Sequence, residues 1–184
     1  MNRRVSHAVP VLLLIGVLAG CTVEQHGAKA VTASQPSAQQ PTSAAPPVTP
    51  GVPQPVTDGK CPYLSNDVVQ EANGQLVRKV RLSEDQPNPA CFFYANATDV
   101  QLSVWVYQGD VKVAKAVVDR AAPIASSSPA SSPEGWAGGS LSSADGAVYA
   151  VSKGGVAVVV TSNQQQTIKA RRITETVVTN LKLG

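Results

Sequence analysis

The stretch that decides the fold is Ala147-Val148-Tyr149-Ala150-Val151-Ser152-Lys153-Gly154-Gly155-Val156-Ala157-Val158-Val159-Val160-Thr161-Ser162. Two runs rich in β-branched residues, 147–152 and 156–162, flank Lys153-Gly154-Gly155, and this pattern predicts a β-hairpin. The run 158–160 does not alternate with polar residues, so it predicts a central strand that is covered on both faces.

The rest of the domain supplies further strands and helices around this hairpin. We expect strands at residues 76–82, 90–95, 100–108 and 136–141. We expect helices at residues 67–73, 110–122 and 164–183. Ser65 and Asp110 are suited to cap the first two helices, and Ile168, Ile173, Val177 and Leu181 should form the buried stripe of the third. The stretch 124–135, rich in Ser and Pro, predicts a loop. This order indicates an α+β fold, with a mainly antiparallel sheet of five to six strands packed with two to three helices.

The amino terminus has the pattern of a bacterial lipoprotein precursor. Arg3 and Arg4 precede an apolar run over residues 8–19, which leads into Leu18-Ala19-Gly20-Cys21. The run is too short to cross a bilayer, which needs about 20 residues. We therefore expect a signal peptide over residues 1–20 and lipidation of Cys21, which would anchor the protein on the extracytoplasmic face of the cell membrane. The alternative is an ordinary secretory signal with a chance cysteine.

A proline-rich segment separates this anchor from the globular part. Residues 21–57 hold seven of the 14 prolines and no aromatic residue. Such a composition cannot bury enough apolar surface to form a core, so it predicts a disordered linker. The remaining residues, 58–184, suit a single globular domain.

The net charge and the cysteine content indicate what the protein does not bind and how its cysteines are used. Without Arg3 and Arg4, 13 of the 15 Lys and Arg residues remain against 12 Asp and Glu, so nucleic-acid binding is not expected. Cys61 and Cys91 form an even pair in an exported domain, which indicates a disulfide. A redox or metal pair is the alternative, but it favours closer spacing and nearby histidine.

The predicted domain has little that could support catalysis. The two histidines, His7 and His26, lie in the signal peptide and the linker, which excludes a Ser-His-Asp system and argues against a zinc site. We expect no enzyme activity, cofactor or metal. Carboxylate pairs keep a histidine-independent hydrolase as an alternative.

Two groups of residues are candidates for binding. Trp105 and Tyr107 lie on one face of the strand 100–108, and Trp136 lies where the preceding loop meets the expected strand 136–141. If helices cover both faces of the sheet, as we expect, the two strand rings are core; if only one face is covered, they line an exposed groove for glycan or lipid. The second group is the basic cluster Lys169, Arg171 and Arg172. It could meet anionic lipid or wall polymer, or be a solvated helix face in which Arg171 pairs with Glu175.

Several segments resemble a family of actinobacterial, mycobacterial-type envelope lipoproteins of unknown function. They are Cys61-Pro62-Tyr63-Leu64, Ala90-Cys91-Phe92-Phe93-Tyr94, Asp119-Arg120-Ala121-Ala122-Pro123, Gly146-Ala147-Val148-Tyr149-Ala150-Val151, Asn163-Gln164-Gln165-Gln166-Thr167 and Lys169-Ala170-Arg171-Arg172. The element order is also similar to that of PsbP-like lipoproteins. The resemblance implies an envelope location but transfers no catalytic residue.

These observations predict a membrane-anchored lipoprotein with a non-catalytic binding domain. Its partner would be an envelope protein, a wall component or an apolar ligand. A lipid or glycolipid carrier is the alternative from another class.

Overall fold

The structure, a computed structural model, describes residues 48–184. The expected signal peptide, Cys21 and the part of the expected linker before residue 48 lie outside the described residues. The helices are α1 (Asn66–Asn73), α2 (Val111–Ala121) and α3 (Thr167–Asn180). The strands are β1 (Thr57–Asp58), β2 (Lys79–Leu82), β3 (Cys91–Tyr94), β4 (Val100–Gln108), β5 (Ser128–Ala130), β6 (Ala137–Ser143), β7 (Gly146–Lys153) and β8 (Val156–Ser162).

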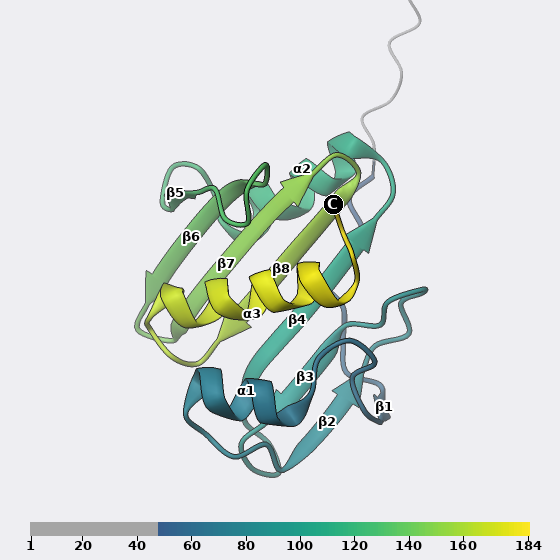
Figure 1. The fold of residues 1–184 in the computed structure, drawn as a ribbon, viewed down its shortest axis with the longest axis vertical. Coiled ribbons are helices and arrows are strands. Elements are labelled where there is room, and N and C mark those ends of the chain that lie inside the picture. Colours follow the sequence, from purple (N-terminus) through teal and green to yellow (C-terminus); the bar gives the residue numbers. More distant parts are fainter. Residues whose placement is uncertain (1–47) are drawn as a thin grey trace, which may run out of the picture. The chain divides into compact units, whose positions relative to one another are not determined.

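The strands form one antiparallel sheet in the order β1-β2-β3-β4-β8-β7-β6-β5 (Figure 1). The α+β class is confirmed, but the expectation of five to six strands is wrong because the sheet has eight. The two strands that the sequence did not predict are β1 and β5, one at each edge. Both are very short. Pro129 lies within β5 and Pro55 lies two residues before β1, and an edge strand tolerates proline because one side of it needs no ladder partner.

Helices cover both faces of this sheet. In Figure 1, α3 crosses the front of the sheet with α1 beside it, and α2 lies behind. The central strand β8 therefore contributes to two cores. Val158 and Val160 pack in the core that includes α1 and α3, whereas Val159 packs in the core that includes α2. The predicted central strand with two covered faces is confirmed.

The helix ends follow from local sequence in two of the three helices. Ser65 accepts a hydrogen bond from Val68 N at the start of α1, and Gly74 ends that helix in the left-handed conformation (φ 74°). Asp110 accepts hydrogen bonds from two amides at the start of α2. In α3 the predicted stripe is partly wrong, because Ile168 is 41% exposed. The buried residues of α3 are Ala170, Ile173, Thr174, Val177 and Val178.

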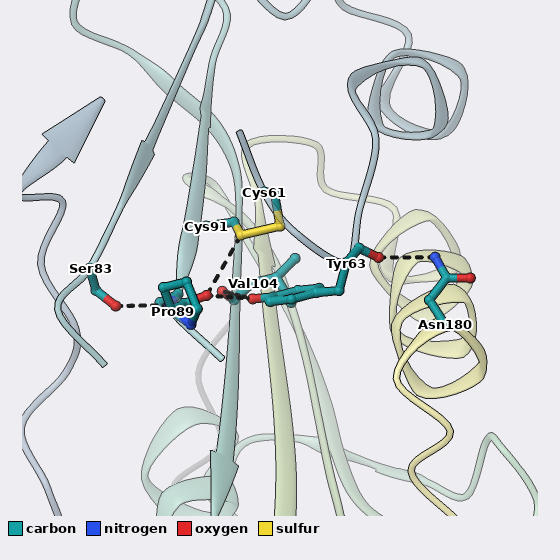
Figure 2. The surroundings of a disulfide bond; sticks show 8 residues. Cys61, Tyr63, Ser83, Pro89, Cys91, Val104 and Asn180 are labelled. Atoms are coloured by element: carbon teal, nitrogen blue, oxygen red, sulfur yellow. Dashed lines mark hydrogen bonds between the residues drawn. A yellow bond between two sulfur atoms is a disulfide. The ribbon is translucent and has the colours of Figure 1, made fainter. Parts of the chain in front are cut away.

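A disulfide links the segment before α1 to the sheet, as the sequence indicated. Cys61 and Cys91 are bonded across a separation of 30 residues, with their Cα atoms 5.6 Å apart. Tyr63 lies beside the bond and donates a hydrogen bond from its hydroxyl to Pro89 O at 2.8 Å (Figure 2). Asn180, at the end of α3, donates from Nδ2 to Tyr63 O at 2.9 Å. The segment around Tyr63 therefore links β3 to α3.

Residues 50–58, here called the strap, run along the α2 side of the sheet. Arg120 on α2 donates from Nη1 to Pro50 O at 2.6 Å, and Val56 N donates to Leu82 O at 2.9 Å. Asp58 pairs with Arg81 at 3.2 Å. The expected boundary between linker and domain, at residue 58, thus falls within β1. Composition shows that a proline-rich segment cannot form its own core, but it does not show that the segment can pack on a sheet built elsewhere.

Candidate binding surfaces

The structure places the candidate aromatic residues in the two cores. Trp105 is 9% exposed and packs against α2, with the Arg120 guanidinium carbon 5.6 Å from the centre of its ring. Tyr107 is half-buried, and its hydroxyl accepts a hydrogen bond from Asp110 N at 3.2 Å. Trp136 is 3% exposed in the core on the α1 and α3 side. These rings therefore do not form the open aromatic groove that a one-sided sheet would have shown.

The three basic residues of α3 have different neighbours. Lys169 donates from Nζ to Asn73 O and to Gln164 Oε1, both at 3.3 Å, so it binds a carbonyl at the end of α1. Arg171 and Arg172 are exposed and point toward different hollows of the surface. Lys169, Arg171 and Arg172, which are close in sequence, therefore belong to three separate parts of the surface.

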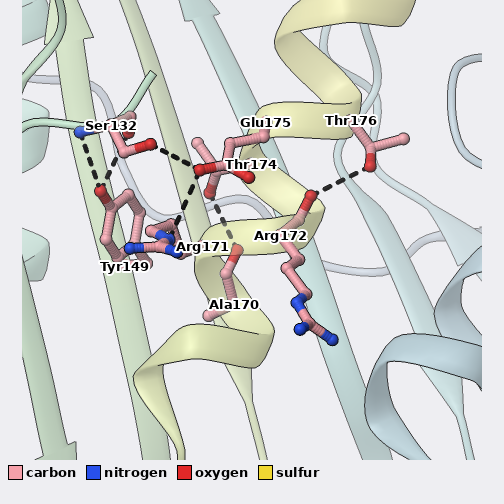
Figure 3. A network of polar contacts seen from close by, with 8 residues as sticks. All are labelled: Ser132, Tyr149, Ala170, Arg171, Arg172, Thr174, Glu175 and Thr176. Carbon is pink, nitrogen blue, oxygen red and sulfur yellow. Dashed lines mark hydrogen bonds and ion pairs between the residues drawn. The ribbon is translucent and has the colours of Figure 1, made fainter. Parts of the chain in front are cut away.

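Arg171 belongs to a network that joins α3 to the segment after β5 (Figure 3). Its Nε lies 3.4 Å from Glu175 Oε1, the ion pair that the i,i+4 spacing predicted. Ser132 donates a hydrogen bond to the same carboxylate, and the Tyr149 hydroxyl donates to Ser132 O at 2.9 Å. Burial raises the pKa of Tyr149, and the hydrogen bond from Ser132 N opposes that shift. Because each polar group has a partner, the network holds the segment against α3.

Arg172 lines a groove of about 520 Å³ between α1 and α3. We call it the helix groove. Ile173 is fully buried at its floor, with Val68 and Ala72 half-buried beside it. The charged and polar residues that line it are Glu71, Arg172, Glu175, Thr176, Thr179 and Asn180. The helix groove therefore combines an apolar floor with side chains of both charges.

Buried polar bonds fix the α1 wall of the groove. Asn73 is 1% exposed at the end of α1 and donates from Nδ2 to Gln101 O and Gln101 Oε1, each at 3.2 Å. Ser162 donates to Asn73 Oδ1 at 2.7 Å. These bonds join α1 to β4 and β8, so the groove lies on elements that the sheet positions. Sequence reasoning missed Asn73, and the only signal was a polar residue at the end of a short helix.

Two negative findings apply to residues 48–184. That part of the chain contains no cluster of three or more His, Cys, Asp or Glu side chains suited to hold a metal ion. Within the same residues, no helix combines the length and the apolar character that a membrane span requires.

The chain belongs to the family described as "Domain of unknown function (DUF2020)", whose model matches residues 44–183. The match begins before the strap, so the strap is part of the family domain. No match to a curated protein is found. The resemblance to an uncharacterised family is thereby confirmed at the level of an unknown-function domain. The actinobacterial origin and the likeness to PsbP-like lipoproteins stay predictions.

Proposed function

We propose that this member of the family is a lipid-anchored envelope protein that binds a protein partner through the helix groove. The anchor rests on the sequence ending in Cys21, which lies outside the described residues. The binding role rests on one observation, the groove of about 520 Å³ between α1 and α3.

The lining of the groove supports a polypeptide as the occupant. Ile173, Val68 and Ala72 offer an apolar strip, while Glu71 and Arg172 carry opposite charges. A polypeptide can match this mixture because it brings apolar and charged side chains together. The groove is formed by two helices, so a partner side chain would enter a preformed hollow with little ordering cost on this side.

The neighbouring polar network supports a binding role over a hydrolytic one. Ser132 donates a hydrogen bond to the Glu175 carboxylate, so it has the arrangement of a nucleophile with a base, as do Ser83 with Asp85 and Thr98 with Asp99 elsewhere in the described residues. Glu175, however, is also paired with Arg171, and Ser132 is held by Tyr149. We therefore assign the network to holding the β5 segment against α3.

Site-specific photocrosslinking in the native envelope tests the proposal. A benzophenone amino acid at Thr176, in the groove, is expected to give a discrete crosslinked adduct. The same group at Val111, on the opposite side of the sheet, should not give that adduct.

A groove-filling variant makes the test specific. Ala72→Trp places a large ring in the groove and should abolish the Thr176 adduct. Ala116→Trp on α2 is the matched control, because Ala116 is also a half-buried helical alanine. Circular dichroism and the thermal midpoint establish that each variant is folded. An adduct that persists in folded Ala72→Trp, or that forms equally from Val111, would refute the groove as the binding site.

A further inference from the structure

A second hollow lies on the other side of the sheet, beneath the strap. Two spaces, of about 440 Å³ and 60 Å³, meet between the strap and the sheet face, and both are lined by Val52, Pro53, Phe92, Ser103 and Thr161. We call the combined space the strap slot. The helix groove is lined by other residues, so the two sites are independent.

Apolar groups dominate the slot. The strap residues Val52, Pro53 and Pro55 form its roof, and the Phe92 ring lies in its floor. The floor ends near Trp105, which lines the smaller space. Polar residues also line the larger space (Gln54, Ser103, Asp145, Thr161, Ser162 and Asn163). An acyl chain that lies on Val52, Pro53 and Phe92 would still be favoured, because it removes their apolar surface from water.

The two ends of the slot differ in charge. Beyond the Trp105 end, outside the lining of either space, the exposed Arg120 guanidinium lies over the indole ring and donates a hydrogen bond to Pro50 O. At the other end, the exposed Asp145 lines the larger space. A ligand with an anionic group is therefore attracted to the Arg120 end and repelled from the Asp145 end.

The roof is held at its ends and exposed in its middle. Arg120 fixes Pro50, and the pairing with β2 fixes Val56 onward. Between these points Val52 is 62% exposed.

We propose that the strap slot binds a single-chain amphiphile, with its acyl chain between the strap and Phe92 and its anionic head group beside Arg120. A free fatty acid and a lysophospholipid share this chemistry. The proposal does not rest on the partner-binding role of the helix groove.

Tryptophan fluorescence of the full mature chain tests the proposal, because the sequence has only two tryptophans. The Trp136→Phe variant leaves Trp105 next to the slot, and the Trp105→Phe variant leaves Trp136 in the opposite core. Dibromostearate is the probe, since bromine quenches an indole that it contacts. Saturable quenching is expected in Trp136→Phe and not in Trp105→Phe, and unbrominated stearate should compete.

Two substitutions in the Trp136→Phe background locate the chain and the head group. Ser103→Phe fills the slot and should weaken dibromostearate binding at least tenfold, whereas Ser152→Phe, in a different hollow beside α2, should not. Arg120→Gln should weaken stearate binding but not the binding of the uncharged stearyl alcohol. Competition by lysophosphatidylglycerol or by stearate then distinguishes the two sources.

Equal quenching of both tryptophans, no saturable quenching, or quenching that folded Ser103→Phe leaves unchanged would overturn the proposal. If Ser103→Phe does not fold, Thr161→Leu and Val52→Asp test the floor and the roof of the slot in its place. These variants carry the same expected tenfold loss, and unchanged binding in both would also overturn it.

Discussion

Removal of the Cys61–Cys91 disulfide should destabilise the domain strongly. The bond closes a separation of 30 residues. On the chain-entropy model a loop of that length contributes about 3.6 kcal/mol at 25 °C. For a domain of this size, each 1 kcal/mol corresponds to roughly 3 to 5 °C in the thermal midpoint. Replacing both cysteines should therefore lower the midpoint by about 10 °C or more.

The choice of replacement separates two contributions. Cys91 is fully buried, so a double serine variant also buries a new hydroxyl, whereas a double alanine variant does not. We expect the double alanine variant to lose only the loop-entropy contribution of the disulfide, and the double serine variant to be still less stable. Urea and thermal unfolding followed by circular dichroism give both values. Maleimide labelling of the native, secreted domain, or a midpoint change below about 3 °C in the alanine pair, would refute the reasoning.

Three further predictions concern stability. A chain that begins at Gly59 should have a free energy of unfolding about 1 to 3 kcal/mol lower than one that begins at Val48, because the hydrogen bonds of the strap to Leu82, Arg81 and Arg120 are removed. Equal urea midpoints for the two chains would contradict this. Asn73→Leu should cost about 3 kcal/mol in urea unfolding, since the side chains of Gln101 and Ser162 lose buried partners, and a loss below about 1 kcal/mol would count against it. Burial, and to a lesser extent the Asp85 charge, raise the pKa of Tyr63. Below a pH of about 10, the usual pKa of a tyrosine in the unfolded chain, the contribution of Tyr63 to the free energy of unfolding is fully present. As the pH rises above about 10, the free energy of unfolding falls by up to about 1.4 kcal/mol per pH unit, because the unfolded state loses this proton first. Tyr63→Phe should remove this excess alkaline loss, and urea unfolding across that pH range measures it.

Local chemistry made much of the fold predictable. Ser65 and Asp110 mark helix starts because their side chains satisfy free amides of the first turn, and β4 follows the predicted range 100–108. The unbroken apolar run in β8 correctly indicated packing on both faces. These features depend on residues close together in the chain.

The features that were missed depend on contacts between distant segments. The strap and β5 carry too little apolar surface to be recognised alone, and they become ordered only on strands built elsewhere. Alternation correctly put Trp105 and Leu102 on opposite faces of β4, but it could not show that α2 and the strap would cover Trp105. The helix groove likewise depends on the packing of α1 beside α3, which no local pattern in either helix encodes.

Native mass spectrometry of the protein purified from its own envelope tests the central proposal, a partner bound in the helix groove, most directly. We expect a discrete mass for the complex with a partner protein, which is lost in Ala72→Trp and kept in Ala116→Trp. A chain without a bound partner protein, or a complex that folded Ala72→Trp retains, would contradict the proposal.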